Sequence, residues 1–395
     1  MSPIFPRSLS LVVAFGLFGA FALAAARDAV GATIVVGQNP AACPGAQFAK
    51  IQDAVNAASP GDTIQICPGV YAEQVSISKA LEVNANNGAI LRPSGAAANS
   101  TGLASGQPIA ALLLIENTTD VTVRNLTIDG IDAGINACSP DLIGVFFRNA
   151  SGQLSHVAVR NAKLSNGFNG CQSGSAILVQ SGGGQNSVVG ISEGSIHGYQ
   201  KNGITANEAG TVVTIEGNVV TGLGSTTGAV QNGIQIGFGA EGTIRHNSVA
   251  NHIWSPCASI DQCTATANDI LVFQSDGVSV HHNVVGVSQT GVAIVGNNAN
   301  VFDNEIFDSQ IFDGVELVGD GNTAQRNRIT DSDQAGVLVA GNSNVVTQNV
   351  INESAIGILK TAGAVGNNIA NNTYFTSPVK LQDPPSGGLK ASPYR

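Results

Sequence analysis

The chain has 395 residues, a net charge of −10 and only 11% charged residues. The acidic balance argues against nucleic acid or an anionic membrane surface as a partner. A single core stops growing near about 250–300 residues, so the length predicts either two domains or one repeat architecture. The 48 glycines and the few charges favour the repeat.

The N-terminus has the pattern of a secretory signal peptide. Arg7 precedes an apolar run from Leu9 to Leu23, and small residues follow it. We expect a signal peptide over residues 1–26, with cleavage as late as residue 32 as an alternative. An uncleaved anchor is the other alternative, but the run is shorter than the roughly 18–20 residues that span a bilayer. The mature chain is expected to be secreted, extracellular or at the cell surface, with no membrane span.

A short amphipathic helix is predicted near the start of the mature chain. Apolar residues fall on one helical face between Gln47 and Ala58, and Pro60 with Gly61 ends the pattern. Strand-like segments follow at 62–71 and 75–77. The helix is expected to cap the first coil and to protect its strand edge from other strands.

Two columns of residues recur along the chain. The first is aliphatic, and its last five members are 22, 23, 22 and 21 residues apart: Ile204, Ile234, Ile270, Val292, Val315, Val337 and Ile358. The second consists of asparagines that are each followed two places later by an apolar residue: Asn218, Asn247, Asn283, Asn304, Asn327, Asn349 and Asn372. A repeat of this length holds three short strands and three turns, and no sustained helical period is present.

These columns predict an all-β fold, a right-handed parallel β-helix (a solenoid) of about eleven or twelve coils with the short N-terminal helix as its cap. The β-helix is expected over residues 33–376, followed by a C-terminal coil tail over 377–395. The asparagines are expected to occupy a turn that needs a left-handed conformation or a sharp bend. Their stacked amides should hydrogen-bond along the rod as a ladder.

Six cysteines, an even number in an exported chain, predict disulfides. We expect three local bridges, with free buried thiols as the alternative. The expected pairs are Cys43 with Cys67, Cys138 with Cys171, and Cys257 with Cys263.

The stretch from Phe48 to Val83 resembles the opening of the pectate-lyase-like superfamily, and the rungs at 200–204 and 231–236 resemble secreted right-handed parallel β-helix repeat proteins. This resemblance implies the fold and an acidic polysaccharide as substrate. The superfamily's catalytic signatures are incomplete here, because only fragments such as Asn268-Asp269-Ile270 occur. Ca²⁺ is compatible with the resemblance, but no motif supports it, and the sequence identifies no other cofactor.

The outward row of the aliphatic-column strands is mostly apolar, which predicts that a loop covers this face or that a partner meets it. The insertion from Trp254 to Asn268 is the candidate cover. The expected outward residues are Phe146, Leu178, Thr205, Gln235, Leu271, Ala293, Glu316, Leu338 and Leu359.

An acidic trio is the first candidate site. Asp269, Asp313 and Glu316 fall on coils one or two apart, and two coils span about 9.6 Å, near the upper limit for an inverting carboxylate pair. Chance placement of acids in an acidic chain is the alternative.

An amide-rich patch is the second candidate site, which we prefer. Tyr199, Gln231, Asn232 and Gln235 would bind sugar hydroxyls, and Lys201 would bind a uronate carboxylate or act as the base of an elimination. The alternative is that these are turn residues that satisfy backbone groups.

No metal site is predicted. His281 and His282 are adjacent, and neighbouring strand residues point to opposite faces, so they are not expected to share one ion. The other histidines lack ligand spacing.

Two functions stay open. The first is binding of an extracellular polysaccharide, with or without lyase-, hydrolase- or epimerase-like processing. The second is a non-catalytic surface or matrix protein that uses the rigid rod for adhesion or assembly. The sequence alone leaves the polymer, the reaction and the oligomeric state undetermined.

Overall fold

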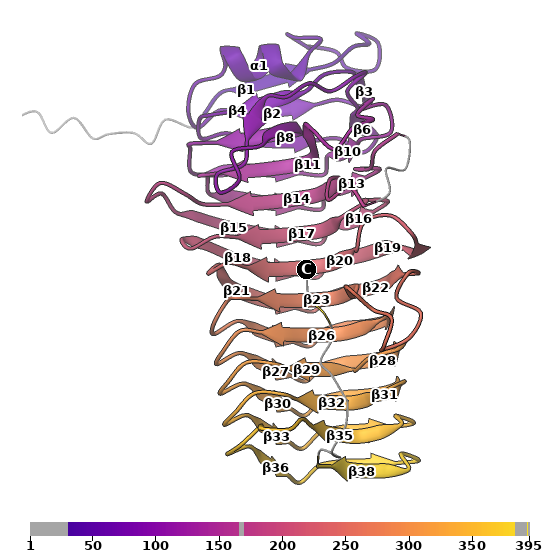
Figure 1. The fold of residues 1–395 in the computed structure, drawn as a ribbon. Helices are drawn as coiled ribbons and strands as arrows, with labels where there is room; N and C mark the ends of the chain where they lie inside the picture. Colours follow the sequence, from indigo (N-terminus) through magenta and orange to yellow (C-terminus); the bar gives the residue numbers. More distant parts are fainter. Residues whose placement is uncertain (1–30, 166–169, 384–392, 394–395) are drawn as a thin grey trace, which may run out of the picture. The chain divides into compact units, whose positions relative to one another are not determined.

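A computed structural model describes residues 31–165, 170–383 and 393. The predicted signal peptide lies outside the described residues. From Thr33 to Gln382 the chain forms a right-handed parallel β-helix, whose three sheets run along the coils (Figure 1). The predicted fold is confirmed.

Each sheet takes one strand from every complete coil. The first sheet has 13 strands, in the order β1 (Thr33–Val36), β2 (Thr63–Ile66), β5 (Glu82–Ala85), β9 (Val121–Arg124), β12 (Gly152–Ser155), β15 (Ser187–Ser192), β18 (Thr211–Glu216), β21 (Glu241–Arg245), β24 (Ser279–His281), β27 (Asn300–Phe302), β30 (Thr323–Gln325), β33 (Val345–Thr347) and β36 (Asn368–Ala370). The second has 12, in the order β3 (Gly69–Tyr71), β6 (Ala89–Leu91), β10 (Thr127–Asp129), β13 (Ala158–Arg160), β16 (Ser195–His197), β19 (Val219–Thr226), β22 (Ser248–Trp254), β25 (Val284–Ser288), β28 (Glu305–Ser309), β31 (Arg328–Ser332), β34 (Val350–Asn352) and β37 (Thr373–Phe375).

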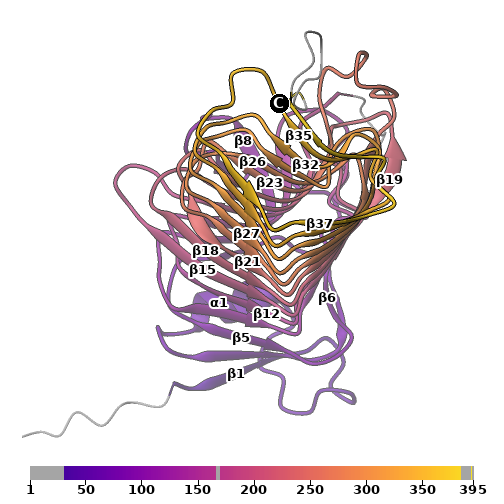
Figure 2. The same cartoon turned by 90° about the horizontal axis from the view of Figure 1, so that it is seen from below.

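The third sheet has 13 strands and carries the candidate site. Twelve of them are parallel: β4 (Val75–Ile77), β8 (Pro108–Glu116), β11 (Asp141–Arg148), β14 (Ser175–Gln180), β17 (Asn202–Asn207), β20 (Asn232–Gly237), β23 (Asn268–Phe273), β26 (Thr290–Val295), β29 (Val315–Leu317), β32 (Ala335–Val339), β35 (Ile356–Lys360) and β38 (Val379–Gln382). The remaining strand, β7 (Ser100–Thr101), pairs antiparallel with β8. Figure 2 views the coils end-on and shows the three sheets around one interior.

The aliphatic column forms the interior of the third sheet. Val292 pairs with Ile270 on one side and with Val315 on the other, and the register continues to Val337 and Ile358. All five side chains are fully buried. Stacked β-branched and aliphatic side chains fill the interior of each coil. Because equivalent side chains must stack on one another, successive repeats have nearly the same length.

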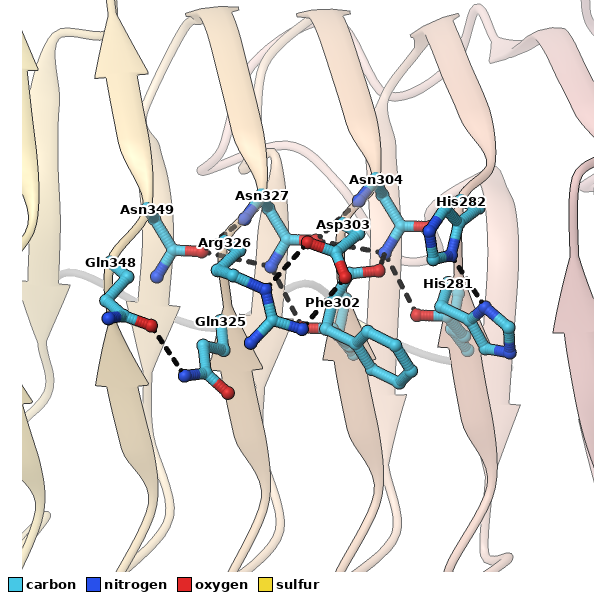
Figure 3. Close-up of polar contacts among 12 residues, drawn as sticks. His281, His282, Phe302, Asp303, Asn304, Gln325, Arg326, Asn327, Gln348 and Asn349 are labelled. Atoms are coloured by element: carbon cyan, nitrogen blue, oxygen red, sulfur yellow. Dashed lines mark hydrogen bonds and ion pairs between the residues drawn. The ribbon is translucent and has the colours of Figure 1, made fainter.

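The asparagine column forms the predicted ladder between the first and second sheets (Figure 3). The Nδ2 of Asn304 donates to the Oδ1 of Asn327 at 2.9 Å, and the Nδ2 of Asn327 donates to the Oδ1 of Asn349 at 3.0 Å. The left-handed conformation falls on the residue before each asparagine, such as Asp303 and Arg326, both with φ 54°. The ladder asparagines accept backbone N–H groups that this turn would otherwise leave unpaired.

The N-terminal cap is the helix α1 (Ile51–Ala57), which packs on β1, β2 and β4 (Figure 1). Its inner face buries Ile51, Ala54 and Val55. The carboxylate of Glu73 accepts the N–H groups of Ile51 and Gln52 at 2.7 and 2.9 Å, and so caps the first turn. The predicted cap is thus present.

The C-terminal end differs from the expectation of a coil from residue 377. β38 pairs with β35 and extends the third sheet to Gln382. Its side chains alternate less clearly than those of earlier strands, and Val379 and Leu381 are exposed. Most of the remaining tail lies outside the described residues.

All three predicted disulfides are present: Cys43–Cys67, Cys138–Cys171 and Cys257–Cys263. They indicate folding in an oxidising, extracytoplasmic compartment. Within residues 31–165 and 170–383, no helix has the length and apolar character needed to cross a bilayer.

Candidate functional site

A groove lies on the outer face of the third sheet, over β8, β11, β14, β17 and β20, beside the segment that follows β7. Its volume is about 350 Å³, within the range of small-molecule sites. Its lining residues include Asp141, Lys201, Asn202, Thr205, Asn207, Gln235 and Phe238.

The wall of the groove is the segment 99–107, which folds back over β8. The side-chain amide of Asn99 exchanges hydrogen bonds of 2.9 and 3.0 Å with the backbone of Ala111. The N–H of Leu103 donates to the Oε1 of Gln180 on β14 at 2.8 Å. An apolar cluster outside the main core, which includes Phe146 and Leu178, lies beneath this wall.

The expected apolar outward row is therefore covered by a loop at its N-terminal end. The predicted cover was the insertion from Trp254 to Asn268, but its residues Trp254, Ala265 and Ala267 pack with Val230, and the insertion does not line the groove. Farther along, Leu338 and Leu359 form a second small cluster apart from the main core.

Hydrogen-bonded amides form the floor of the groove. The Nδ2 of Asn202 donates to the Oγ1 of Thr205 at 3.0 Å and to the Oε1 of Gln235 at 3.2 Å. The Nε2 of Gln235 donates to the Oδ1 of Asn207 at 3.2 Å. At the rim, Phe238 is 43% exposed and meets Phe273 edge to face. Amides beside an exposed aromatic ring can bind hydroxyls and one face of a sugar.

Asp141, the first residue of β11, and Lys201, the residue before β17, line the same groove two coils apart. Burial raises the pKa of Asp141 to about 6, although hydrogen bonds from Ser173 and the Gly174 backbone oppose the shift. The Oδ1 of Asp141 is buried without a hydrogen-bond partner. Burial lowers the pKa of Lys201 to about 8, and its Nζ donates to the carbonyl oxygen of Val230 at 2.8 Å. Near neutral pH each group can therefore exchange a proton.

The predicted amide patch divides between the groove and the interior. Lys201 and Gln235 line the groove, whereas Tyr199, Gln231 and Asn232 are buried at 0–1% exposure. The Nε2 of Gln231 donates to the carbonyl oxygen of Tyr199 at 2.8 Å, and its Oε1 accepts the N–H of Leu223. These buried side chains form hydrogen bonds with backbone and side-chain groups inside the protein.

The buried Tyr199 belongs to a polar chain inside the coil. Its hydroxyl pairs with the Nε2 of His252, whose Nδ1 lies 2.5 Å from the Oδ1 of Asp269. All three side chains are 0% exposed. Burial raises the pKa of Asp269 to about 6, and its hydrogen bond with His252 opposes the shift. The chain is sealed from solvent in this conformation.

The acidic trio does not open onto a cleft. Asp269 faces the interior chain, while Asp313 and Glu316 lie two coils farther on, and all three are 0% exposed. The Nε2 of Gln334 donates to both oxygens of Asp313 at 3.0 and 3.2 Å. Burial raises the pKa of Asp313, and the neighbouring Glu316 raises it further.

Three histidines meet on the surface between the first and second sheets. The Nδ1 atoms of His281 and His282 are 2.9 Å apart, and the ring of His246 lies 5.0 Å from that of His282. The expected divergence of the pair is wrong, because His282 has φ 56° and is a turn residue to which strand alternation does not apply. In the described part of the chain, no group of three or more His, Cys, Asp or Glu is arranged to hold a metal ion.

A family model described as periplasmic copper-binding protein (NosD) matches residues 191–389, half of the chain. The chain belongs to the NosD family. The matched NosD segment includes Lys201, Gln235 and the three histidines, whereas Asp141 and the wall of the groove precede it.

Solved structures similar to this NosD-family chain have parallel β-helix folds. A GH136 lacto-N-biosidase from Eubacterium ramulus superposes with a TM-score of 0.60 at 13% identity, covering 88% of this chain and 67% of its own. The Dettilon tailspike protein superposes with a TM-score of 0.54 at 12% identity, and the match covers 82% of this chain and 63% of the tailspike protein. A mutant of the periplasmic alginate epimerase AlgG superposes with a TM-score of 0.53 at 12% identity, and the match covers 84% of this chain and 83% of the epimerase. At these identities the likeness establishes the fold alone. No curated protein matches this NosD-family chain.

Asp141 is the chemically reactive groove residue that the sequence analysis did not single out, and the groove amides of Asn202 and Asn207 were missed as well. Asp141 follows a Ser-Pro pair at the start of β11, where an acidic residue is an ordinary turn signal. Its role depends on the wall from 99 to 107, which lies outside the repeat. No periodic pattern could therefore have paired it with Lys201.

Proposed function

We propose that the groove binds a uronic acid-containing polysaccharide outside the cytoplasm and processes it by proton transfer, in a lyase- or epimerase-like reaction. The observation that carries the proposal is the pairing of Asp141 and Lys201 across a floor of amides. The likeness to a lacto-N-biosidase and an alginate epimerase is compatible with it but does not identify a substrate.

The chemistry follows from the two shifted groups. A neutral Lys201 takes the proton from the carbon next to the uronate carboxylate. In an elimination, the protonated Asp141 gives its proton to the departing glycosidic oxygen as the carbon–oxygen bond breaks. In an epimerisation, Asp141 gives its proton to the opposite face of the same carbon. The amides of Asn202 and Gln235 hold the sugar hydroxyls, so that the reacting atoms stay in place.

The test is a panel of oligomannuronate, oligogalacturonate and a neutral oligosaccharide. Elimination is followed by the ultraviolet absorbance of the unsaturated product, and epimerisation by NMR. We expect turnover of an acidic oligosaccharide that Lys201→Ala and Asp141→Asn each reduce to a small residual rate. Lys163→Ala, which changes an exposed lysine outside the groove, should leave turnover unchanged. If no oligosaccharide is bound or turned over, the non-catalytic surface or matrix protein is the better account.

A second candidate function is binding of copper, which the description of the matched family suggests. The specific observation in its favour is that the rings of His246, His281 and His282 lie near one another within the matched segment, although they do not form a three-ligand metal site in the described residues. Imidazole is a preferred ligand of copper. This function uses a different face of the β-helix from the groove and does not depend on it.

A further inference from the structure

The groove on the third sheet has two chemically different ends. Lys201 lies directly before β17, and Glu208 lies directly after it. β17 has six residues, so its two ends lie about 16–17 Å apart, which is about the length of three linked pyranose rings. Both residues line the groove, so a sugar chain laid along β17 contacts both ends at once.

A hydrogen-bonded row of amides joins the two ends. It starts at Asn202, the first residue of β17, and passes through Gln235 on β20 to Asn207, the last residue of β17. The Oε1 of Gln235 accepts from Asn202 at 3.2 Å, and its Nε2 donates to Asn207 at 3.2 Å. Because an amide both donates and accepts, the row offers hydrogen-bond partners to the hydroxyls of successive sugar rings. The row therefore gives the direction of a bound chain, from Lys201 towards Glu208.

An aromatic ring lies at the Glu208 end of the groove. β17 and β20 pair in register, which places Glu208 and Phe238 side by side after the two strands. Phe238 is 43% exposed, and its backbone N–H donates to the carbonyl oxygen of Phe273 at 2.9 Å. It has φ 57°, a conformation that aromatic residues seldom adopt, whereas Asn149 holds the equivalent position on an earlier coil with φ 50°. The ring offers a flat apolar surface to one face of a sugar.

The charges of the groove also differ between its ends. Lys201 and Asp141 lie at the end where the strands begin, and the ammonium group there offsets the charge of the carboxylate. Glu208 is the ionisable residue that lines the opposite end. A uronate bound beside Glu208 would meet a like charge. A neutral sugar would instead donate its hydroxyls to the Glu208 carboxylate and place its apolar face on the Phe238 ring.

We propose that the groove recognises a mixed polysaccharide, with a uronate at Lys201 and neutral sugars towards Phe238. This inference rests on the proposed polysaccharide function of the groove and narrows its substrate class, because a polymer of uronates alone places a carboxylate beside Glu208. Lys201 and Asp141 carry out the proton transfer, whereas Glu208 and Phe238 select the sugar chain about three rings away.

The experiment measures the binding of two octasaccharides to the full-length protein by calorimetry near neutral pH. One has a repeating unit of one glucuronate and three neutral sugars, and the other consists of mannuronate alone. Asp141→Asn is the parent of every variant, because its small residual rate leaves the ligand intact during a titration, and the wild type is titrated alongside. We expect both to bind the mixed octasaccharide more tightly, by about 5-fold or more, as for a like charge at about 4 Å in water.

The two selecting residues should respond in different ways. In Phe238→Asn the affinity for the mixed octasaccharide should fall by about 3- to 10-fold, the range expected for an aromatic contact. Glu208→Gln should raise the affinity for the mannuronate octamer by about 5-fold and leave that for the mixed octasaccharide nearly unchanged, because it removes only the like charge. A loss of general stability would weaken the binding of both ligands and would not change their ratio.

Phe307→Ala and Glu193→Gln are the matched controls. Phe307 is 36% exposed on β28 of the second sheet, Glu193 is an exposed turn residue with φ 54°, and neither lines the groove. Asparagine suits the left-handed turn at Phe238, so its melting curve should match that of the parent. If both octasaccharides bind equally and neither groove variant changes their ratio, this inference is wrong although the groove function stands. If the wild type binds no acidic oligosaccharide, the groove function is wrong as well.

Discussion

Asp141 and Lys201 line one groove two coils apart, and burial moves their pKa values towards each other, to about 6 and about 8. An acid and a base of these strengths both exchange protons near neutral pH. Neither forms an ion pair with the other in the described structure, and the Nζ of Lys201 instead donates to the carbonyl oxygen of Val230. This relationship is the basis of the proposed function.

The first prediction concerns the pH dependence of turnover. The reactive form needs Asp141 protonated and Lys201 neutral, so kcat/KM should rise up to about pH 6, stay level, and fall above about pH 8. Residual turnover of Asp141→Asn should rise with pH through about 8 and then stay level, because only the base still titrates. Residual turnover of Lys201→Met should be level at low pH and fall above about pH 6. The same pH profile in the wild type and both variants would contradict the assignment.

The second prediction concerns Asp313, whose pKa is raised by burial and by Glu316. The folded state binds a proton that the unfolded state releases above its ordinary value of about 4. Stability should therefore fall as pH rises from about 4 towards the folded pKa. Asp313→Asn removes this penalty and supplies an N–H group towards Glu316. We expect it to be more stable than the wild type at pH 8 by about 1 kcal/mol, with little difference at pH 4. Urea unfolding at both pH values measures this, and an equal change at both would refute it.

The third prediction concerns the asparagine ladder. The amide of Asn327 donates to the Oδ1 of Asn349 and the carbonyl oxygen of Val301, and its own Oδ1 accepts from Asn304. Asn327→Ala leaves these buried groups unpaired and should cost about 1–3 kcal/mol. Gln348→Ala is the control, because Gln348 lies exposed on the neighbouring coil and bonds only the side chain of Gln325 in the described structure. Equal melting temperatures for the two variants would mean that the ladder does not stabilise the fold.

The fourth prediction compares two disulfides by the length of chain that each closes. Cys43 and Cys67 are 24 residues apart, whereas Cys257 and Cys263 are 6 apart. From loop entropy, removal of the first bridge should cost about 3–3.5 kcal/mol and removal of the second about 2 kcal/mol. Double serine variants compared by urea unfolding provide the measurement. A larger loss for the Cys257–Cys263 variant would contradict the entropic account.

The fold could be predicted because the repeat itself encodes it. Val292, Val315 and Val337 stack because each repeat places the same residue type at the same point of the coil. The disulfides could be predicted because their partners lie close in the sequence. The conformation of the turn was harder to predict from the sequence, because the left-handed position is occupied by residues as different as His282, Asp303 and Arg326.

The candidate site was only partly predictable. Lys201 and Gln235 stand out as a cation and an amide on adjacent coils, and both line the groove. Tyr199 and Asp269 could not be assigned to the interior, because polar residues are rarely buried and their partner His252 comes from another strand. The approach of the His281 and His282 rings could not be predicted either, because His282 is a turn residue and the alternation of a strand does not apply to it.

The most direct test of the central claim is a crystal structure of Asp141→Asn with the acidic oligosaccharide that the wild type turns over. Loss of the acid should trap the ligand without changing the shape of the groove. We predict sugar density between the wall at 99–107 and the amides of Asn202 and Gln235, with a uronate carboxylate or the reacting carbon beside the Nζ of Lys201. Density for the sugar on another face of the β-helix, with the groove empty at a saturating concentration, would contradict the account.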